Sequence, residues 1–219
     1  MIVIDKDSKG TIALYWVVSL ILAILSILFI HPLWILVPVL VLIAVFAFFV
    51  FWFHRVPDRE LPQYDDSFVT SVADGKIVIV GKAYESEYFK DERLQDSIYM
   101  NFFDVHANFW PMDGEISYYK YHPGHYLLAF HPKASEKNEH SSTAIKGTKG
   151  EILFKQIAGT FARRIVCYSK EGMAVKAGDQ CGIIKFGSRI DMFLPLDADV
   201  KVKVGDLTRA SETLIAELH

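Results

Sequence analysis

A long apolar stretch that lacks charged residues lies near the start of the chain. From Thr11 to Phe53 it contains no Asp, Glu, Lys or Arg. As a single helix this stretch would extend roughly 64 Å, about twice the thickness of the hydrocarbon core of a bilayer. His31 and Pro32 divide it into residues 11–30 and 33–53, each close to the ~20 residues that one span needs. The pattern therefore predicts a membrane helical hairpin over residues 11–53.

Positive charges flank the hairpin on both sides. Lys6 and Lys9 precede it and Arg55 and Arg59 follow it, whereas the turn between the helices has no Lys or Arg. Cytoplasmic flanks carry an excess of Lys and Arg, so both ends are predicted to lie on the cytoplasmic side of the cell (inner) membrane. A signal peptide is an alternative, but no small-residue cleavage site follows the first apolar run. Pro38 leaves open whether the second segment spans the bilayer or only dips into it.

After the hairpin, short apolar runs alternate with turn residues. Residues 1–10 form a short cytoplasmic segment, the charged and proline-containing residues 54–66 are typical of a linker, and residues 67–219 are predicted to fold as one mainly β domain with some α. Asp74-Gly75 joins two runs, at 68–73 and 76–81, and so predicts a β-hairpin. Further strands are expected at 97–105, 115–121, 125–130, 151–156 and 164–168, with an exposed loop or lid at 133–150 and a short helix at 157–165.

Composition and charge restrict the partners and the cysteine chemistry that we expect. The 219-residue chain is 52% apolar, which is high for a soluble protein, and the hairpin accounts for the excess. Its net charge of −3 does not draw it to anionic lipid, and we expect no nucleic-acid partner. Cys167 and Cys181 are too few for a disulfide framework, so both are expected to be reduced, buried thiols.

One dipeptide near the end of the chain has unusual chemical potential. Of the 13 glycines, Gly187 alone is followed by serine, and apolar runs predicted to be short strands flank Gly187 and Ser188. The hydroxyl of a serine after glycine can attack the preceding carbonyl with no side chain in the way. If the resulting ester eliminates, the new N-terminus passes through dehydroalanine to a pyruvoyl group. A plain Gly-Ser turn is the alternative interpretation.

Several short motifs occur together in one order along the chain. They are ADG at 73–75, NFFDVHAN at 101–108, NE at 138–139, QIAG at 156–159, ARRI at 162–165 and FGSR at 186–189. In this order the sequence resembles the phosphatidylserine decarboxylase proenzymes in their shorter bacterial and archaeal form, over nearly the whole chain.

The resemblance implies an activity and a maturation step. The protein would be a pyruvoyl-dependent carboxy-lyase that cleaves itself between Gly187 and Ser188, giving a beta chain of residues 1–187 and an alpha chain of residues 188–219. Ser188 would become the covalent pyruvoyl cofactor. This group would form a Schiff base with phosphatidylserine, and loss of carbon dioxide would leave phosphatidylethanolamine. The implied fold is β-rich, similar to the barrel-sandwich hybrids of biotinyl and lipoyl carriers.

The resemblance also implies roles for individual residues. His106 would be the base that activates Ser188, and Asp74 would be the carboxylate that completes the triad. Phe103, Asn108, Arg163 and Arg164 are weaker candidates for substrate contacts. The chain departs from longer family members, which have a second histidine at the position of Phe103. It also has His140 where an arginine usually follows the Asn-Glu pair.

The resemblance also implies partners, and two alternative functions are left open. The implied partners are membrane phospholipid and the membrane itself, and a homodimer is left open. No metal site is expected, because His122, His125 and His131 lack a carboxylate or thiol at a convincing spacing. One alternative is a pyruvoyl-dependent decarboxylase of a soluble amino acid. The other is a non-catalytic, membrane-tethered β module in which Gly187-Ser188 is only a turn.

Overall fold

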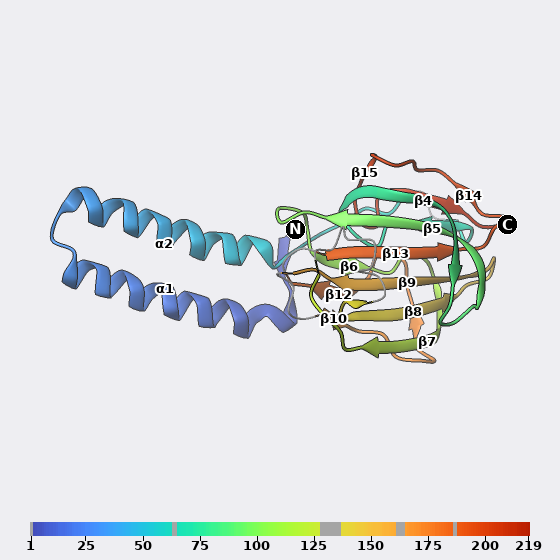
Figure 1. The fold of residues 1–219 in the computed structure, drawn as a ribbon, viewed down its shortest axis with the longest axis horizontal. Coiled ribbons are helices and arrows are strands. Elements are labelled where there is room, and N and C mark those ends of the chain that lie inside the picture. The colour runs from blue at the N-terminus through green and yellow to red at the C-terminus, as the bar shows by residue number, and fades with distance from the viewer. Residues whose placement is uncertain (1, 63–64, 128–136, 161–164, 186–187) are drawn as a thin grey trace. The chain divides into compact units, whose positions relative to one another are not determined.

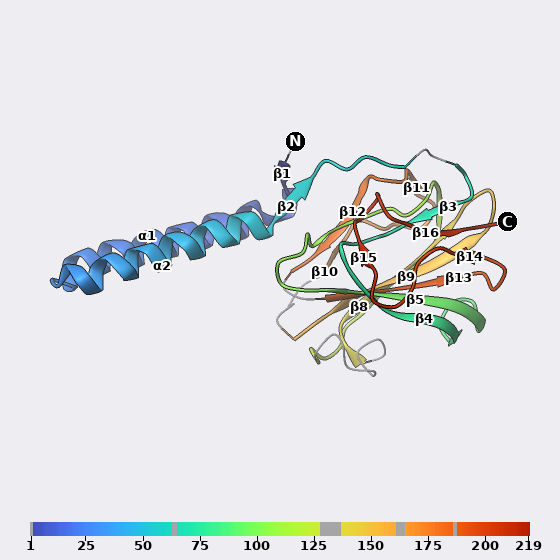
Figure 2. The ribbon, with the colours of Figure 1, turned by 90° about the horizontal axis from the view of Figure 1, so that it is seen from above.

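The chain folds into two compact units with different secondary structure. The computed structural model describes residues 2–62, 65–127, 137–160, 165–185 and 188–219 (Figures 1 and 2). The first unit, Met1–Asp58, is mainly helical, and the second, Arg59–His219, is built from strands. This division follows the change from continuous to alternating apolar patterns along the chain.

The first unit contains the predicted helical hairpin. Helices α1 (Lys9–Phe29) and α2 (Leu33–Phe53) run side by side, and α2 continues through Pro38 (Figure 1). The indole N–H of Trp16 on α1 donates a hydrogen bond of 3.2 Å to the carbonyl of Ala47 on α2. Most of their large apolar side chains are exposed, which is typical of helices that face lipid. Within the described residues, these two helices are long and apolar enough to cross a membrane.

A short two-stranded sheet joins the two ends of the hairpin. Strand β1 (Ile2–Ile4) precedes a 3-10 turn at Lys6–Ser8, and β2 (Arg55–Pro57) follows α2. The two strands pair antiparallel, and the Asp5 N–H donates to the His54 carbonyl at 3.1 Å. The sequence did not predict this pairing, because a three-residue strand has too few positions to show an alternating pattern.

A large antiparallel sheet dominates the second unit. Among the described residues, its strands in spatial order are β11 (Ala174–Val175), β7 (Gly114–His122), β8 (His140–Lys146), β9 (Glu151–Ala158), β13 (Ser188–Leu194), β5 (Asp91–Met100), β4 (Gly75–Glu85) and β15 (Leu207–Thr208). Strand β13 comes from the last part of the chain, yet it lies in the middle of the sheet between β9 and β5.

Two smaller sheets cover one side of the large sheet, as Figure 2 shows. The first contains β10 (Ile165–Cys167), β12 (Gln180–Ile184) and β6 (Ala107–Phe109) in that order. The second contains β14 (Asp199–Val200), β16 (Leu214–Glu217) and β3 (Phe68–Thr70). The apolar core fills the space between these layers and includes Ile190, Met192 and Leu194 of β13. The predicted mainly β fold class is thereby confirmed.

The predicted hairpin around Asp74-Gly75 is wrong. Strand β3 pairs with β16, and β4 pairs with β5 and β15, so the two runs belong to different sheets. Gly75 is needed for close packing, because a Cβ atom there would lie 2.4 Å from the carbonyl oxygen of Tyr99 on β5. A glycine that permits close backbone approach looks the same in sequence as a glycine in a turn.

The predicted exposed loop at 133–150 is also wrong over β8, which is buried except at Lys146. Its serine and threonine side chains find partners inside the fold. Ser141 donates to Gln156 at 2.9 Å, and Thr143 lies 2.8 Å from Ser169. Polar composition therefore predicted exposure, whereas internal hydrogen bonds allow these residues to be buried. Residues 128–136 lie outside the described part of the chain.

Other elements match in part. Predicted strands at 115–121, 151–156 and 164–168 correspond to β7, β9 and β10, and the runs that flank Gly187-Ser188 to β12 and β13. The strand predicted at 97–105 is wrong beyond Met100, where a turn begins. The helix predicted at 157–165 is wrong at its start, which belongs to β9, and residues 161–164 lie outside the described residues. Of the strand predicted at 125–130, the structure gives a single bridge between His125 and Asn138, and 128–130 are not described.

Candidate active site

Ser188 is the first residue of the central strand β13 and is fully buried. In register it lies between Met100 at the end of β5 and Ala158 at the end of β9. Its hydroxyl donates a hydrogen bond of 2.9 Å to the Met100 sulfur. A thioether is a weak acceptor, so the serine proton is not committed to a strong base in this arrangement. Gly187, the other half of the predicted cleavage site, lies outside the described residues.

His106 is buried next to the strand that leads toward Ser188. Its backbone carbonyl accepts a hydrogen bond from Ile184 at the end of β12, four positions before Ser188. Its ring Nδ1 lies 2.9 Å from the Asp104 carbonyl oxygen. Because a carbonyl can only accept, Nδ1 carries the proton and a neutral ring keeps its lone pair on Nε2. The tautomer is therefore the one that a general base needs.

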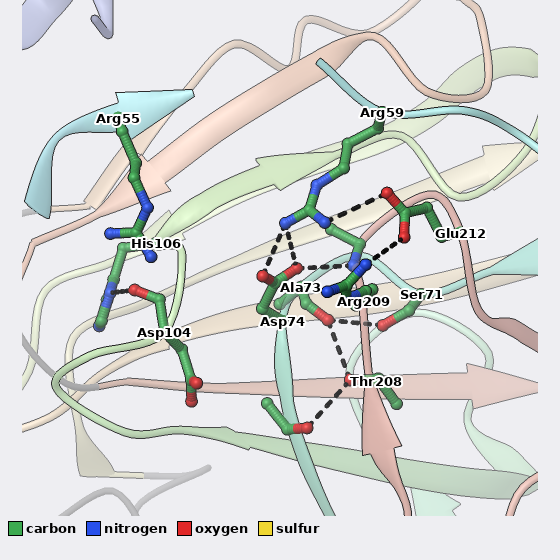
Figure 3. A network of polar contacts seen from close by, with 12 residues as sticks. Arg55, Arg59, Ser71, Ala73, Asp74, Asp104, His106, Thr208, Arg209 and Glu212 are labelled. Carbon is green, nitrogen blue, oxygen red and sulfur yellow. Dashed lines mark hydrogen bonds and ion pairs between the residues drawn. The ribbon is translucent and has the colours of Figure 1, made fainter. Parts of the chain in front are cut away.

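Asp74 lies in a different group of contacts, shown in Figure 3. Both of its carboxylate oxygens accept hydrogen bonds from Arg59 Nη2, at 2.8 and 2.6 Å. The backbone N–H of Ala210 also donates to Asp74 Oδ1 at 2.8 Å. In the same view the dashed line from the His106 ring leads to Asp104. The backbone of Asp104 thus provides the tautomer-setting contact that the sequence assigned to Asp74.

Arg59 is a functional candidate that the sequence did not single out. Its side chain is only 7% exposed and also reaches Glu212, at 3.3 Å from Nη1. It lies in the charged, proline-containing segment that was interpreted as a linker, where an arginine is normally solvated. Arg59 differs from a solvated arginine in its pairing with Asp74, which lies 15 positions later in the sequence. No local sequence pattern reveals such a pairing.

A buried hydrogen-bond network lies beneath Ser188. Gln156 donates to Asn108 Oδ1 at 2.8 Å, and Asn108 Nδ2 lies 4.0 Å from the Met100 sulfur. Ser141 in turn donates to Gln156 at 2.9 Å. Asn108, predicted as a substrate contact, is thus engaged within the protein and supports the sulfur that Ser188 contacts. Gln156 belongs to the QIAG motif, which had carried no assigned role.

Asn138 fixes the end of β9, the strand that borders Ser188 on the side opposite β5. Its side-chain amide donates to the carbonyls of Leu127 and Ala158 at 2.8 and 2.7 Å, and its Oδ1 accepts from the Leu127 N–H. Ala158 is the register partner of Ser188. The Asn-Glu motif therefore fixes the segment that borders the site. Arg163 and Arg164, the predicted headgroup contacts, lie outside the described residues.

Phe103 is 75% exposed on the turn between Met100 and His106. Asn101 closes this turn, because its backbone N–H donates to Asp104 Oδ2 at 2.7 Å and its Oδ1 accepts from the Phe103 N–H at 2.8 Å. The aromatic ring therefore projects outward beside the buried serine and histidine. Its exposure shows that this ring does not pack in the core.

Glu87, His122 and His140 meet elsewhere on the large sheet, with ligand atoms within 4.8 Å of one another. Glu87 is the carboxylate that the histidine spacing did not show. The imidazole rings of His122 and His140 stack at 4.3 Å, only 14° from parallel, so their nitrogen lone pairs do not converge on one point. Glu87 also accepts hydrogen bonds from Ser142 at 2.7 Å and pairs with Lys155 at 3.1 Å. These contacts fit a structural polar cluster better than a metal site.

Comparison with known proteins gives a consistent result. A sequence model of the phosphatidylserine decarboxylase family matches residues 46–216. The phosphatidylserine decarboxylase proenzyme of Amoebophilus asiaticus is 48% identical over 170 residues, covering 77% of this chain and 75% of that protein. The proenzyme of Cytophaga hutchinsonii is 43% identical over 182 residues, covering 83% and 82%. The proenzyme of Prosthecochloris aestuarii is 37% identical over 182 residues, covering 83% of each chain.

Proposed function

Because this chain belongs to the phosphatidylserine decarboxylase family, we propose that it converts phosphatidylserine to phosphatidylethanolamine with release of carbon dioxide. We propose further that it matures by cleaving itself between Gly187 and Ser188. The position of Ser188 carries this second proposal. Its hydroxyl is buried at the start of the central strand, directly after the one glycine that precedes a serine, and among the described residues it donates to a weak thioether acceptor.

In the proposed cleavage, the Ser188 hydroxyl attacks the Gly187 carbonyl carbon while His106 Nε2 removes its proton. The C–N bond of the peptide breaks, its nitrogen takes up a proton, and an ester replaces the amide. A base then removes the Cα proton of residue 188 and the Cβ–O bond of the ester breaks, which leaves a Gly187 carboxylate and a dehydroalanine at position 188. Water hydrolyses the dehydroalanine and releases ammonia, so the new N-terminus becomes a pyruvoyl group.

His106 and Asp74 have separate supporting contacts in this scheme. The Asp104 carbonyl holds the proton on His106 Nδ1, so the lone pair lies on Nε2, the nitrogen proposed to act as the base. We keep Asp74 as the proposed carboxylate of the triad, held in place by Arg59 and the Ala210 N–H. After cleavage, His106 is the proposed donor of the proton that replaces the lost carboxyl group.

The residues around Ser188 suit an uncharged terminal group. The position is fully buried, and a free serine N-terminus there would place an ammonium in an apolar environment at a cost of several kcal/mol. A pyruvoyl group is neutral at its terminus, and its carbonyl supplies an electron sink when carbon dioxide leaves. Met100 and the Asn108–Gln156 pair would hold this end of β13.

The two apolar helices favour a lipid over a soluble substrate. A tether places the enzyme beside substrate that already lies in the leaflet and so raises its effective concentration. The positive flanks of the hairpin support the proposal that the catalytic unit lies on the cytoplasmic side of the cell membrane. Phe103, Asn108, Arg163 and Arg164 stay predicted contacts for the substrate.

Intact-mass analysis tests self-cleavage. We expect the purified protein to separate under denaturing conditions into residues 1–187 and a 188–219 fragment that begins with a pyruvoyl group. Ser188→Ala should remain one chain, and His106→Ala should cleave at least about 100-fold more slowly, because general-base assistance is lost. Ser211→Ala, which removes a buried hydroxyl with no partner among the described residues, and His125→Ala, at an exposed histidine, are matched controls. A single uncut wild-type chain would refute the proposed maturation.

Carbon dioxide release tests the substrate with the same preparations. Cleaved protein should release carbon dioxide from phosphatidylserine in detergent micelles and not from free serine, whereas Ser188→Ala should release none above background. Release from serine but not from the lipid would favour the soluble-substrate alternative. Complete cleavage without release from either substrate would leave the maturation proposal intact and refute the activity.

A further inference from the structure

Four exposed aromatic side chains surround the end of the large sheet at which Ser188 lies. Phe102, Phe103, Tyr121 and Tyr126, here named the aromatic rim, are 38%, 75%, 47% and 42% exposed. An exposed aromatic ring keeps a large apolar surface in water, and several together are typical of a binding surface.

Strand register places the aromatic rim around the candidate site. Across the sheet, His122 at the end of β7 is opposite His140, which is opposite Ile157 on β9. Ile157 is in turn next to Arg189 on β13, and Arg189 to Tyr99 on β5. The last residues of β7 and β5 and the first residues of β13 therefore share one end of the sheet. Tyr121 belongs to this end of β7.

The other members of the rim follow directly from this end. Phe102 and Phe103 come immediately after Met100, the residue that contacts Ser188. Tyr126 precedes Leu127, whose backbone is bonded through Asn138 to Ala158, the register partner of Ser188. Four aromatic side chains from two separate segments are thus brought to the border of one site.

The turn that presents the two phenylalanines is fixed by its own hydrogen bonds. Asn101 and Asp104 bond the turn from both ends, at 2.7 and 2.8 Å. The rings of Phe102 and Phe103 also contact each other edge to face, with centroids 6.5 Å apart. A surface held in this way loses little conformational entropy when it binds.

We propose that the aromatic rim docks on the lipid bilayer and borders the end of the sheet at which a phospholipid would reach Ser188 and His106. This proposal rests on the proposed lipid substrate. Aromatic side chains concentrate at the headgroup level of membranes, where tyrosine places its ring in the apolar region and its hydroxyl in water. The apolar helices already bring the chain to a membrane, so a bilayer is the partner within reach of an exposed aromatic surface.

The ionisation of Tyr121 agrees with this partner. Burial and a hydrogen bond with the Glu139 carboxylate raise the pKa of Tyr121 to about 12. A tyrosine with its ordinary pKa of 10 is already uncharged at neutral pH, and the shift keeps this ring uncharged at more alkaline pH as well. A phenolate at the same place would be repelled by an anionic membrane surface.

Tyr84 provides a matched control at the opposite end of the sheet. It is 64% exposed, near the end of β4, where Glu85 pairs with Asp91 at the start of β5. The ten residues of β5 separate it from the Phe102–Phe103 turn by about 30 Å. A bilayer that contacts the rim cannot also cover Tyr84 without tilting the whole sheet.

Spin labelling of the full chain in phosphatidylserine-containing vesicles tests the proposal. Nitroxides would be attached to Phe103→Cys, Tyr126→Cys and Tyr84→Cys in a Cys167→Ser background. Cys181 is fully buried, and burial raises its pKa well above the ordinary value, so it should stay unlabelled. Labels at 103 and 126 should be more accessible to oxygen, which dissolves in lipid, than to a water-soluble nickel chelate. The label at 84 should show the reverse order.

The alternative outcomes are distinct. A label at 103 that is as accessible to nickel as the label at 84 would overturn the proposal. Strong spin–spin broadening at 103 with low access to both reagents would show a second copy of the chain on the rim, and would also overturn it. The same measurement on Ser188→Ala separates this inference from the proposed function. Lipid exposure at 103 without any carbon dioxide release from the wild type would support the rim and refute the activity.

Kinetics give a second test of the rim. The double variant Phe102→Ser/Phe103→Ser should raise the KM for phosphatidylserine in vesicles by about 10-fold, the order expected for losing the burial of one aromatic side chain. Because the rim is proposed to bind the bilayer, the loss should appear mainly in KM rather than in kcat. Tyr84→Ser should leave KM unchanged. An unchanged KM in the double variant would overturn the proposal, as would a loss confined to kcat.

Discussion

At the scale of single residues, Asp96 on β5 is a carboxylate in an unfavourable environment. Its side chain is fully buried, and neither carboxylate oxygen has a hydrogen-bond partner among the described residues. In register it lies beside Val80 and Met192, so its surroundings are apolar. Burial raises its pKa from 3.8 to about 7. The protonated form is therefore the one that the fold accommodates.

This shift predicts how stability depends on pH. The folded pKa lies above the unfolded pKa, so the group costs nothing below pH 3.8 and about 1.4 kcal/mol for each pH unit up to about 7. Between pH 5 and pH 8, Asp96 should therefore remove roughly 3 kcal/mol of stability. Asp96→Leu should abolish this loss, measured as the difference in thermal midpoint at the two pH values, in the uncut Ser188→Ala protein. Asp91→Asn, at the exposed start of the same strand, should not, and an equal pH slope in Asp96→Leu would contradict the prediction.

The sequence identified some of the site residues, but not the contacts that set their protonation. Ser188 was visible because it follows the one glycine placed before a serine, and His106 because it lies in a recognisable motif. The partner of the His106 ring was not visible, since it is the backbone carbonyl of Asp104, and every residue has a carbonyl. Asp96 could not be identified as buried, because its local sequence is polar and burial depends on which strands lie over it.

At the scale of elements, the Arg59–Asp74 pair joins segments that are distant in sequence. Arg59 lies in the segment before β3, Asp74 directly before β4, and Glu212 just before β16. The pair is largely shielded from water, with side chains 7% and 15% exposed. Removing one member of such a pair leaves a buried charge that cannot be solvated.

Arg59→Met should therefore destabilise the fold by about 3 kcal/mol, because it leaves the Asp74 carboxylate with the Ala210 N–H alone. Asp74→Leu added to it should recover part of this loss. Arg93→Met is the matched control, since Arg93 pairs with the half-exposed Asp91 and should cost less than about 1 kcal/mol. Denaturant unfolding in the Ser188→Ala background measures the three variants without interference from cleavage. Equal costs for the Arg59 and Arg93 variants would contradict the prediction.

Elements were predictable where the pattern is long and uniform. The two helices were predicted to within two residues at their starts and one at their ends, because an uncharged apolar run has one interpretation. Strand β8 was not, since its serines and threonines are compatible with a loop unless Gln156 and Ser169 are known to face them. The strands that pair with β3 and β4 could not be predicted either. An Asp-Gly pair predicts a turn whether or not the two strands that flank it pair with each other.

At the scale of the whole molecule, the order of strands indicates that the chain folds before the proposed cleavage. Residues 188–219 supply β13 to the large sheet between β9 and β5, β15 to its edge, and β14 and β16 to a small sheet. The order of the strands could not be predicted from the sequence, because antiparallel pairing depends on long-range contacts that leave no local periodicity. The two proposed fragments, residues 1–187 and 188–219, thus both contribute strands to the large sheet before any bond breaks.

The two chains should therefore stay together after cleavage. Seven residues of β13 pair with β5 and six with β9, so cutting the chain before Ser188 leaves these hydrogen bonds intact. Ile190, Met192, Leu194, Ile215 and Leu218 of the 188–219 fragment are buried in the core. At roughly 2 kcal/mol each, these five side chains contribute about 10 kcal/mol, which offsets much of the entropy cost of association. Size-exclusion chromatography in mild detergent should give wild type and uncut Ser188→Ala the same elution volume, with the fragment released only by denaturant. A wild-type peak that lacks the 188–219 fragment would show that the bond before Ser188 holds the sheet together, contrary to this prediction.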